Sequence, residues 1–429
     1  MLWNLLYIGL LLAAAPVIAY RAIRQNRYRR GVRQKLFGLS PADAQRATAG
    51  RPCHWLHGVS VGEINLLPKL VKQLESADPS TPIVISTSTD AGYDLAVELF
   101  GRDRVFFAPL DFTWAVRRTL RSLRCNSLTL VELEIWPNLV AAAKRSGATV
   151  GIINGRLSEN SCRGYRRAAL LTRPTFGKID RVLCGTDGDA KRFKRCGTPE
   201  HRTSVTGSLK FDNAPTDAGD PAVMRLRHLA GVDPWHRVWI AGSTAAGEES
   251  MVLSIYNRVR IDHPELRLII VPRHPRRFDN VADDIRSAGL IVRRQTQTTD
   301  PPPSDWQTDT VFLGDTIGHL RHWWGVAHIA TVGGSFGTRG GQNMIEPAGY
   351  GAAVSFGPHT RNFRDITRLL LTAGAATRVA DEPELETFVR RCLQNPAAAQ
   401  TMGTRAANLV RSHQGSLQKT VQTLTEKAA

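Results

Sequence analysis

Three carboxylates in the first half of the sequence follow apolar runs that are typical of buried strands. Glu63 closes the segment HGVSVGE (residues 57–63), where a strand runs into a turn and a helix is expected to start near Ser60. Free N–H groups and the helix dipole favour an ionised carboxylate in a first helical turn, which suits a general base. The Ser60-Val61-Gly62-Glu63 spacing equally fits a capping box, in which Glu63 only closes the helix end.

Glu132 and Glu134 stand in VELEIWPN (residues 131–138), at the end of another apolar run. Strand alternation places both carboxylates on one face, with Leu133 and Ile135 opposite. Carboxylates at the carboxyl edge of a parallel sheet are well placed for chemistry, because ligands of such sheets bind at that edge.

Basic residues and hydroxyl-bearing turns accompany these carboxylates. Lys210 lies in GSLKFD (residues 207–212), near the junction of the two halves, and Arg156 lies in GRLSENS (residues 155–161). STSTDAG (residues 86–92) places hydroxyls and a glycine where a strand meets a helix, which suits an anion or a helix cap. A solvated lysine and a solvated basic face remain the alternatives for Lys210 and Arg156.

The second half contains four turns suited to binding a phosphate. They are AGSTAAGEE (residues 241–249), VPRHPRRF (271–278), VGGSFGTRGGQNMIEP (332–347) and SFGPHTRNF (355–363). Glycine lets backbone N–H groups approach an anion closely, and a following helix adds its N-terminus. Ordinary turn and cap chemistry is the alternative for all four.

Several other chemistries lack a motif. No GxGxxG precedes an acid at the spacing of a nicotinamide site, and no HExxH or CxxC pair is present. The six cysteines are spread along the chain, so we expect neither a zinc site nor a disulfide framework. We therefore expect no metal and no other cofactor.

From residue 52 onward, short apolar runs alternate with helical stretches such as 66–75 and 139–145, which predicts parallel sheets covered by helices. The predicted strands are residues 82–86, 128–131, 149–153 and 181–184 in the first half, and 238–241, 266–271, 311–313, 329–332 and 352–355 in the second. We expect two doubly wound domains, 51–211 and 235–429, joined by a linker (212–234), with ligands between them. Residues 295–307 are predicted to form an exposed loop.

The N-terminus is typical of a membrane protein. Residues 1–20 carry no charge and are about as long as the roughly 20 apolar residues that cross a bilayer. A basic segment follows at residues 21–50. From Arg21 to Arg51 the chain has nine Lys/Arg residues and one acid, Asp43. The positive-inside rule then keeps the basic segment and the following body on the cytoplasmic side of the membrane. A cleaved signal peptide is an alternative, and Pro16 allows a helix that lies in one leaflet.

The net charge of +18 favours an anionic partner. Anionic lipid headgroups and phosphorylated substrates both meet that requirement. A nucleic-acid-binding protein would show interleaved aromatic and basic residues or a known reading module, and neither is apparent, so no nucleic acid is expected. A nonenzymatic membrane scaffold gives no reason for carboxylates and glycines at strand ends.

Taken in order, ten segments resemble the 3-deoxy-D-manno-octulosonic acid (Kdo) transferases of lipopolysaccharide synthesis. The segments are HGVSVGE, TSTDAG, ELEIWPN, GRLSENS, GSLKFD, STAAGEE, PRHPRRF, GGSFGTRGGQN, IEP and GPHTRNF. The resemblance implies a GT-B fold, in which two Rossmann-like domains face a central cleft. It also implies a membrane-associated inverting enzyme that transfers Kdo from CMP-Kdo to a lipid A precursor, a tetraacyl disaccharide bisphosphate. A GT-B enzyme using another nucleotide sugar is the alternative.

The resemblance also implies residue roles. Glu63 matches the proton acceptor, and Glu132 and Lys210 match transition-state stabilisers. The positions that match CMP-binding segments are Pro272, Arg273, Ile317, Gly318, His319, Asn343, Met344, Ile345 and Glu346. The chain departs from the family pattern where Ala245, His319 and Gln342 replace the usual His, Glu and His.

Overall fold

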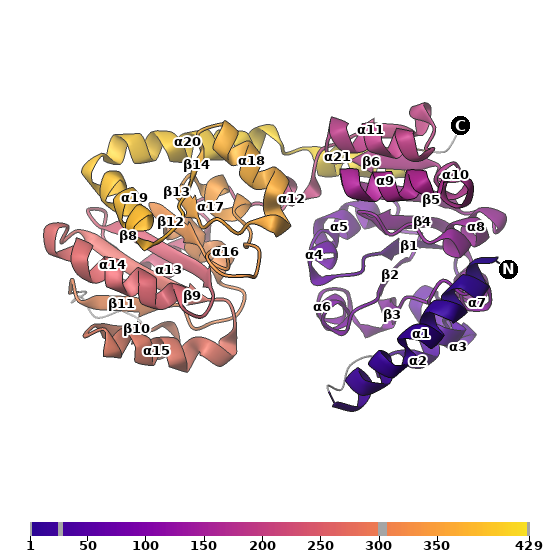
Figure 1. Ribbon diagram of the computed structural model, residues 1–429, viewed down its shortest axis with the longest axis horizontal. Helices are drawn as coiled ribbons and strands as arrows, with labels where there is room; N and C mark the ends of the chain where they lie inside the picture. The colour runs from indigo at the N-terminus through magenta and orange to yellow at the C-terminus, as the bar shows by residue number, and fades with distance from the viewer. Residues whose placement is uncertain (1, 25–28, 299–306, 427–429) are drawn as a thin grey trace. The chain divides into compact units, whose positions relative to one another are not determined.

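The computed structural model describes residues 2–24, 29–298 and 307–426 of the 429-residue chain. They form two compact units, residues 1–213 with 414–429 and residues 214–413 (Figure 1). This division differs from the predicted boundaries at two places. The segment predicted as a linker groups with the second unit, and the C-terminal helix α21 (Ser416–Thr425) groups with the first.

The first unit contains a seven-stranded sheet in the order β3-β2-β1-β4-β5-β6-β7. All its neighbouring strands are parallel. The strands are β1 (Cys53–His57), β2 (Ile83–Thr87), β3 (Val105–Phe107), β4 (Cys125–Val131), β5 (Thr149–Gly155), β6 (Arg181–Cys184) and β7 (Thr203–Val205). Their apolar runs are continuous because helices cover both faces of the sheet.

Two apolar clusters lie on opposite faces of this sheet, and adjacent residues of β1 divide between them. Trp55 packs with residues of α3, α7, α8 and α11, whereas Leu56 packs with residues of α5, α6 and α21. The helices of this unit are α1 (Leu2–Arg24), α2 (Val32–Phe37), α3 (Pro41–Thr48), α4 (Val61–Ile64), α5 (Leu67–Ala77), α6 (Asp90–Phe100), α7 (Thr113–Leu123), α8 (Pro137–Arg145), α9 (Glu159–Arg167), α10 (Ala169–Phe176), α11 (Asp187–Cys196), α12 (Leu209–Asp212) and α21.

The second unit repeats this architecture with the sheet order β10-β11-β9-β8-β12-β13-β14, again all parallel. Its strands are β8 (Arg237–Thr244), β9 (Leu266–Pro272), β10 (Ile291–Arg294), β11 (Thr310–Leu313), β12 (Ile329–Val332), β13 (Ala353–Phe356) and β14 (Ala376–Arg378). Its helices are α13 (Pro221–Leu229), α14 (Glu248–Asp262), α15 (Phe278–Ser287), α16 (Leu320–Trp323), α17 (Ile345–Tyr350), α18 (Arg364–Thr372), α19 (Glu382–Gln394) and α20 (Pro396–Ser412).

All nine strands predicted with bounds are present, with ends that differ by up to three residues, and β1 is the strand expected before the Glu63 turn. The strands that the prediction lacked are β3, β7, β10 and β14, which form the outer edges of the two sheets. β3 has only three residues, and β7, β10 and β14 are short strands with exposed or half-buried residues, so none of them has a long continuous apolar run. The predicted linker is not a simple connection, because it contains α13, whose Val223 and Leu226 are buried.

The predicted exposed loop at 295–307 needs a similar correction at its start. Gln295 opens a short 3-10 helix (Gln295–Gln297) and is only 8% exposed. Residues 299–306 of that loop lie outside the described residues. At the N-terminus, the described part of the chain contains no helix with the length and apolarity to cross a membrane.

Helix α21 provides a test of how the first unit is assembled. The Asp212 carboxylate accepts hydrogen bonds from the Gly415 and Leu417 N–H groups at 2.6 and 3.0 Å and from the Ser416 hydroxyl at 2.5 Å. Asp212→Ala should lower the free energy of unfolding by about 1–2 kcal/mol, as loss of a helix cap does. Urea denaturation measures this change.

The matched control is Asp103→Ala, which removes an exposed carboxylate that makes no hydrogen bond within the described residues. Equal unfolding midpoints for the two variants would show that Asp212 does not hold α21.

Candidate active site

Each sheet reverses its strand order beside its first strand. β1 lies between β2 and β4, and β8 lies between β9 and β12. Chain connections leave in opposite directions on the two sides of such a point, so the loops at the carboxyl ends separate and leave room for a ligand. In the first unit these loops carry Glu63 and Glu132, and in the second they carry Arg273 and Asn343.

Glu63 lies in the four-residue helix α4, and its carboxylate holds the turn that precedes it. Oε2 accepts a hydrogen bond from the Val59 N–H at 2.7 Å, and Oε1 accepts one from the Ser60 hydroxyl at 2.8 Å. The Ser60 hydroxyl caps no backbone N–H group of α4, and the Glu63 carboxylate accepts from the Val59 rather than the Ser60 N–H, so neither hydrogen bond of the predicted capping box is formed. The Glu63 carboxylate therefore stabilises the turn formed by Val59 and Ser60, and it lies at the carboxyl edge of the sheet.

The predicted anion turn STSTDAG supports the same region. The hydroxyls of Thr87 and Thr89 donate to the Val59 carbonyl at 2.9 and 3.0 Å. Thr89 also caps α6 by accepting from the Gly92 N–H at 3.2 Å. The capping alternative is thus confirmed for Thr89, and both threonines fix the turn on which Glu63 depends.

The surroundings of Glu63 raise the pKa of its carboxyl group. Glu63 is only 9% exposed, and burial raises the pKa of its carboxyl to about 7 despite the opposing hydrogen bonds from Val59 and Ser60. The charges of Glu132 and Glu134 raise this pKa further. The sequence predicted an ionised group from the helix start, but α4 is short and desolvation is the larger effect. Near neutral pH both protonation states are populated.

Glu132 directly follows the last residue of β4 and is not part of the strand. Its backbone adopts the left-handed conformation with φ of +61°, one residue after β4 ends. Lys210 Nζ lies 3.2 Å and Arg156 Nη1 lies 3.9 Å from Glu132 Oε1. The structure thus brings together Glu132 and Lys210, which the sequence analysis had paired only by resemblance, and adds Arg156.

Asn154 is a site residue that the sequence analysis missed. It is fully buried and left-handed, with φ of +50°. Its Nδ2 donates to Glu132 Oε1 at 3.3 Å, and its Oδ1 accepts from the Ser208 hydroxyl at 3.0 Å. Few non-glycine residues adopt this conformation, although Asn tolerates it better than most, and those that do gather at functional sites. Asn154 links the end of β5 to the turn that carries Lys210.

In the second unit a buried carboxylate organises the glycine-rich turn. Glu248, which is 5% exposed, accepts backbone N–H bonds from Ala245, Gly334, Ser335 and Phe336 at 2.7–3.0 Å. The loop after β8 is thereby fixed to the loop after β12. The sequence analysis interpreted residues 241–249 as an anion turn and did not recognise this role of Glu248.

The predicted CMP-binding residues lie in three loops of the second unit. Pro272 ends β9, and the exposed Arg273 follows it. Met344 and Ile345 are buried, so only their backbone is available to a ligand. Asn343 precedes them and donates to Glu346 Oε1 at 3.1 Å.

The third loop follows β11 and presents three predicted residues to solvent. Ile317 is 78% exposed, Gly318 is left-handed with φ of +83°, and His319 is also exposed. Gln295 Nε2 donates to His319 Nδ1 at 2.8 Å, so a neutral His319 carries its proton on Nε2. Gln295 therefore orients a predicted site residue, although its sequence context indicated an exposed loop.

Two further features bear on cofactors. Within residues 2–24, 29–298 and 307–426, no three His, Cys, Asp or Glu side chains are grouped so as to hold a metal ion. All six cysteines are buried free thiols. The groups available for chemistry are the buried Glu63 carboxylate, the Glu132–Lys210 pair and the glycine-rich loops of the second unit.

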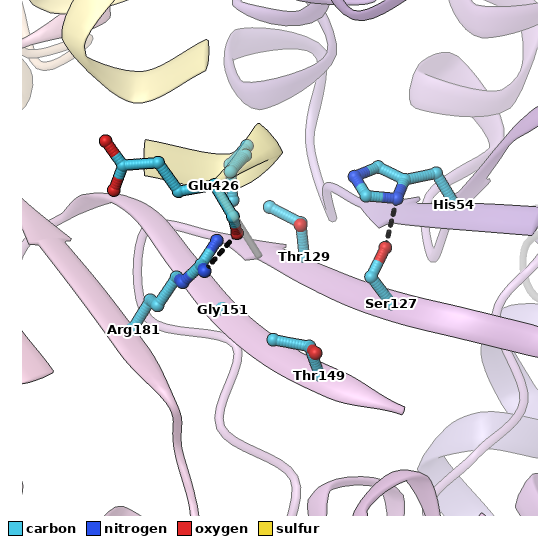
Figure 2. A pocket seen from close by; sticks show the side chains of 8 residues that line it. His54, Ser127, Thr129, Thr149, Gly151, Arg181 and Glu426 are labelled. Carbon is cyan, nitrogen blue, oxygen red and sulfur yellow. Dashed lines mark hydrogen bonds between the residues drawn. The ribbon is translucent and has the colours of Figure 1, made fainter. Parts of the chain in front are cut away.

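A pocket in the first unit lies at the opposite edge of the sheet (Figure 2). His54, Ser127, Thr149 and Arg181, near the amino ends of their strands, contribute to its lining. The Arg181 guanidinium donates to the Thr423 and Glu426 carbonyls, which ties down the end of α21. No predicted site residue lines this pocket, so it is distinct from the candidate active site.

Two parallel α/β units of this kind make up the GT-B fold. Solved structures with this fold include a UDP-GlcNAc 2-epimerase from Neisseria meningitidis, with a TM-score of 0.55 and 12% identity over 86% of this chain and 100% of that one. A glycosyltransferase from Rickettsia africae gives a TM-score of 0.55 and 11% identity over 88% of this chain and 100% of that one.

Sequence comparison is more specific. A family model described as 3-deoxy-D-manno-octulosonic-acid transferase (kdotransferase) matches residues 30–213. The 3-deoxy-D-manno-octulosonic acid transferase of Bordetella pertussis is 34% identical over 96% of both chains, and that of Haemophilus influenzae is 29% identical over 97% of both. The chain belongs to the Kdo transferase family.

The pKa of Glu63 is directly measurable. With ¹³C-labelled glutamate, one carboxyl signal should titrate with a midpoint near pH 7 and be absent in Glu63→Gln. Glu132→Gln should lower that midpoint, because it removes a like charge that disfavours ionisation of Glu63. A Glu63 midpoint below about 5, near the ordinary glutamate value of roughly 4.3, would contradict the burial argument.

Proposed function

We propose that this enzyme transfers Kdo from CMP-Kdo to a lipid A precursor with inversion at the anomeric carbon. The observation that carries the proposal is the buried Glu63 carboxylate, with its pKa raised to about 7, at the same sheet edge as the Glu132–Lys210 pair. Membership of the Kdo transferase family supplies the sugar, because its members are named for that transfer.

Glu63 acts as the proton acceptor for the attacking hydroxyl of the lipid acceptor. A sugar hydroxyl is about as weakly acidic as water, with a pKa of roughly 15.7, so a carboxylate cannot ionise it beforehand. The proton moves to Glu63 as the new carbon–oxygen bond forms and the oxygen becomes acidic. A base with a pKa near the working pH is well matched to this role, since much of it is ionised while it remains basic.

The leaving group needs electrostatic stabilisation rather than a proton. CMP departs as a phosphate anion, and Arg273 together with backbone N–H groups of the glycine-rich loop can neutralise its developing charge. Lys210 contributes positive charge at the same sheet edge, and its ammonium group lies 3.2 Å from Glu132 Oε1. Direct displacement with a single base inverts the anomeric configuration.

Glu63→Gln should lower kcat by roughly 10²–10⁴-fold, which is the usual contribution of a general base. Mass spectrometry of the product, from the purified variant with CMP-Kdo and the tetraacyl acceptor, measures the loss. Wild-type turnover should rise through pH 7 and level off above it, because only ionised Glu63 accepts the proton, whereas the residual rate of the variant should lack that rise.

CMP binding by the variant is the control for an intact donor site, and UDP-sugars test the alternative donor. A Glu63→Gln enzyme that retains a large fraction of wild-type turnover would exclude Glu63 as the base. Transfer from a UDP-sugar but not from CMP-Kdo would exclude the proposed donor.

We also propose that the enzyme works at the cytoplasmic face of the inner membrane, bound to anionic lipid through α1. One face of α1 is attached to the first unit, since Tyr7 donates to Asp111 Oδ2 at 2.9 Å and Asn4 Oδ1 accepts from Asn138 Nδ2 at 3.0 Å. Large apolar side chains elsewhere on the helix are exposed, including Leu5 at 67% and Leu12 at 70%. These attachments favour a helix that lies in one leaflet beside the body.

A pair of substitutions tests this proposal. Burying one leucine contributes about 1.5–3 kcal/mol, so Leu12→Asp should lower the partition coefficient onto phosphatidylglycerol-containing vesicles by about tenfold or more. Vesicle co-sedimentation measures it. Ile261→Asp, at a residue of the second unit that is 76% exposed, is the matched control and should bind as wild type does. Equal binding of both variants would argue against α1 as the contact.

A further inference from the structure

Arginines gather in the loops at the carboxyl edge of the second sheet. Arg273 and Arg276 follow β9, Arg339 follows β12 and Arg361 follows β13. All four are exposed, and within the part of the chain that the structure describes none forms an ion pair with a carboxylate. Arg277, by contrast, is paired with Glu249. Unneutralised like charges repel one another, so such a cluster indicates a place for anions.

Hydrogen bonds hold two of these loops together. The Asn362 N–H donates to the Gly340 carbonyl at 3.0 Å, and Asn362 Nδ2 donates to the Arg339 carbonyl at 3.0 Å. Gly340 has φ of +90°, and a Cβ atom there would lie 2.6 Å from Arg361 Cγ. Only glycine allows this close approach, which sets Arg339 beside the loop after β13.

Arg339 also has an unusual partner in the loop after β9. Its Nη1 lies 2.8 Å from His274 Nε2. An arginine can only donate, so the imidazole accepts and is neutral. Burial and the charges of Arg339 and Arg273 lower the pKa of His274, in agreement with that state. A guanidinium has five N–H groups, and this bond orients Arg339 while leaving others available to a ligand.

The number of anionic groups on the donor indicates how many anion sites the second unit needs. The phosphate of a CMP-sugar is one anion, and Arg273 with the glycine-rich backbone can bind it. The sugar named by this family is an acid, so its donor carries a carboxylate as a second anion. A guanidinium binds a carboxylate through two parallel hydrogen bonds, which gives both strength and orientation.

We propose that Arg339, oriented by His274, binds the carboxylate of the donor sugar and selects an acidic sugar. This inference rests on the proposed function, because it assigns a second anion site on the same donor. His274 is a positioning residue in this arrangement and acts through Arg339.

The test compares two ligands that differ in the carboxylate-bearing sugar. Arg339→Gln should raise the KM for CMP-Kdo by about tenfold or more, since it removes a charge-assisted pair. The dissociation constant of CMP, which lacks the sugar, should stay within about twofold of wild type by calorimetry. CMP binding also shows that the variant is folded.

A double-mutant cycle tests the role of His274. His274→Asn should weaken CMP-Kdo less than Arg339→Gln does and should have little further effect in the double variant, because both act on one interaction. Arg276→Gln removes the same charge from the same neighbourhood and is the matched control; it should affect CMP and CMP-Kdo by the same small factor.

Two results would overturn the proposal. One is an equal loss of CMP and CMP-Kdo affinity in Arg339→Gln, which would assign Arg339 to the phosphate. The other is an unchanged KM for CMP-Kdo. Failure of the wild-type enzyme to use CMP-Kdo at all would instead refute the proposed function, so the two failures are distinguishable.

Discussion

The reversal of strand order beside β1 is the constraint on which the candidate site depends. Because connections leave β1 and β4 on opposite faces, their carboxyl ends open apart, and the residues that follow each strand project into the same space. Glu63 reaches that space through the turn after β1, and Glu132 reaches it through a left-handed residue directly after β4. The second unit has the same reversal beside β8, where the loops proposed to bind the donor begin.

Glu63 and Glu132 lie at the same sheet edge in different surroundings. Glu63 is held in a desolvated turn, which raises its pKa to about 7. Glu132 instead lies 3.2 Å from Lys210 Nζ and receives a hydrogen bond from Asn154. The two carboxylates can therefore have different roles, Glu63 as a base and Glu132 as part of an ion pair. Asn154, which bonds both Glu132 and Ser208, helps to hold this ion pair in place.

Strands with a long apolar run could be predicted from the sequence, and strands without one were missed. The central strands have continuous apolar runs, whereas β3 and β14, with three residues each, leave no recognisable period. The membership of α21 in the first unit follows from contacts of Asp212 with residues more than 200 positions away, which no local pattern reveals.

The same contrast holds for the site. Glu63, Glu132 and Lys210 were found because they stand in segments that resemble a known family. Asn154, Glu248 and Gln295 were missed, because each acts through hydrogen bonds to distant backbone or side-chain atoms. The helix start near Ser60 suggested an ionised Glu63, but α4 has only four residues and the degree of burial is a tertiary property.

Chemical rescue tests most directly whether Glu63 accepts the proton. Truncation in Glu63→Ala leaves room for a small carboxylate where the side chain stood. Added formate should restore Kdo transfer in proportion to its concentration, with the rescued rate following the ionised fraction of formate rather than a group of pKa about 7. Substantial transfer by Glu63→Ala without any added carboxylate would contradict the account.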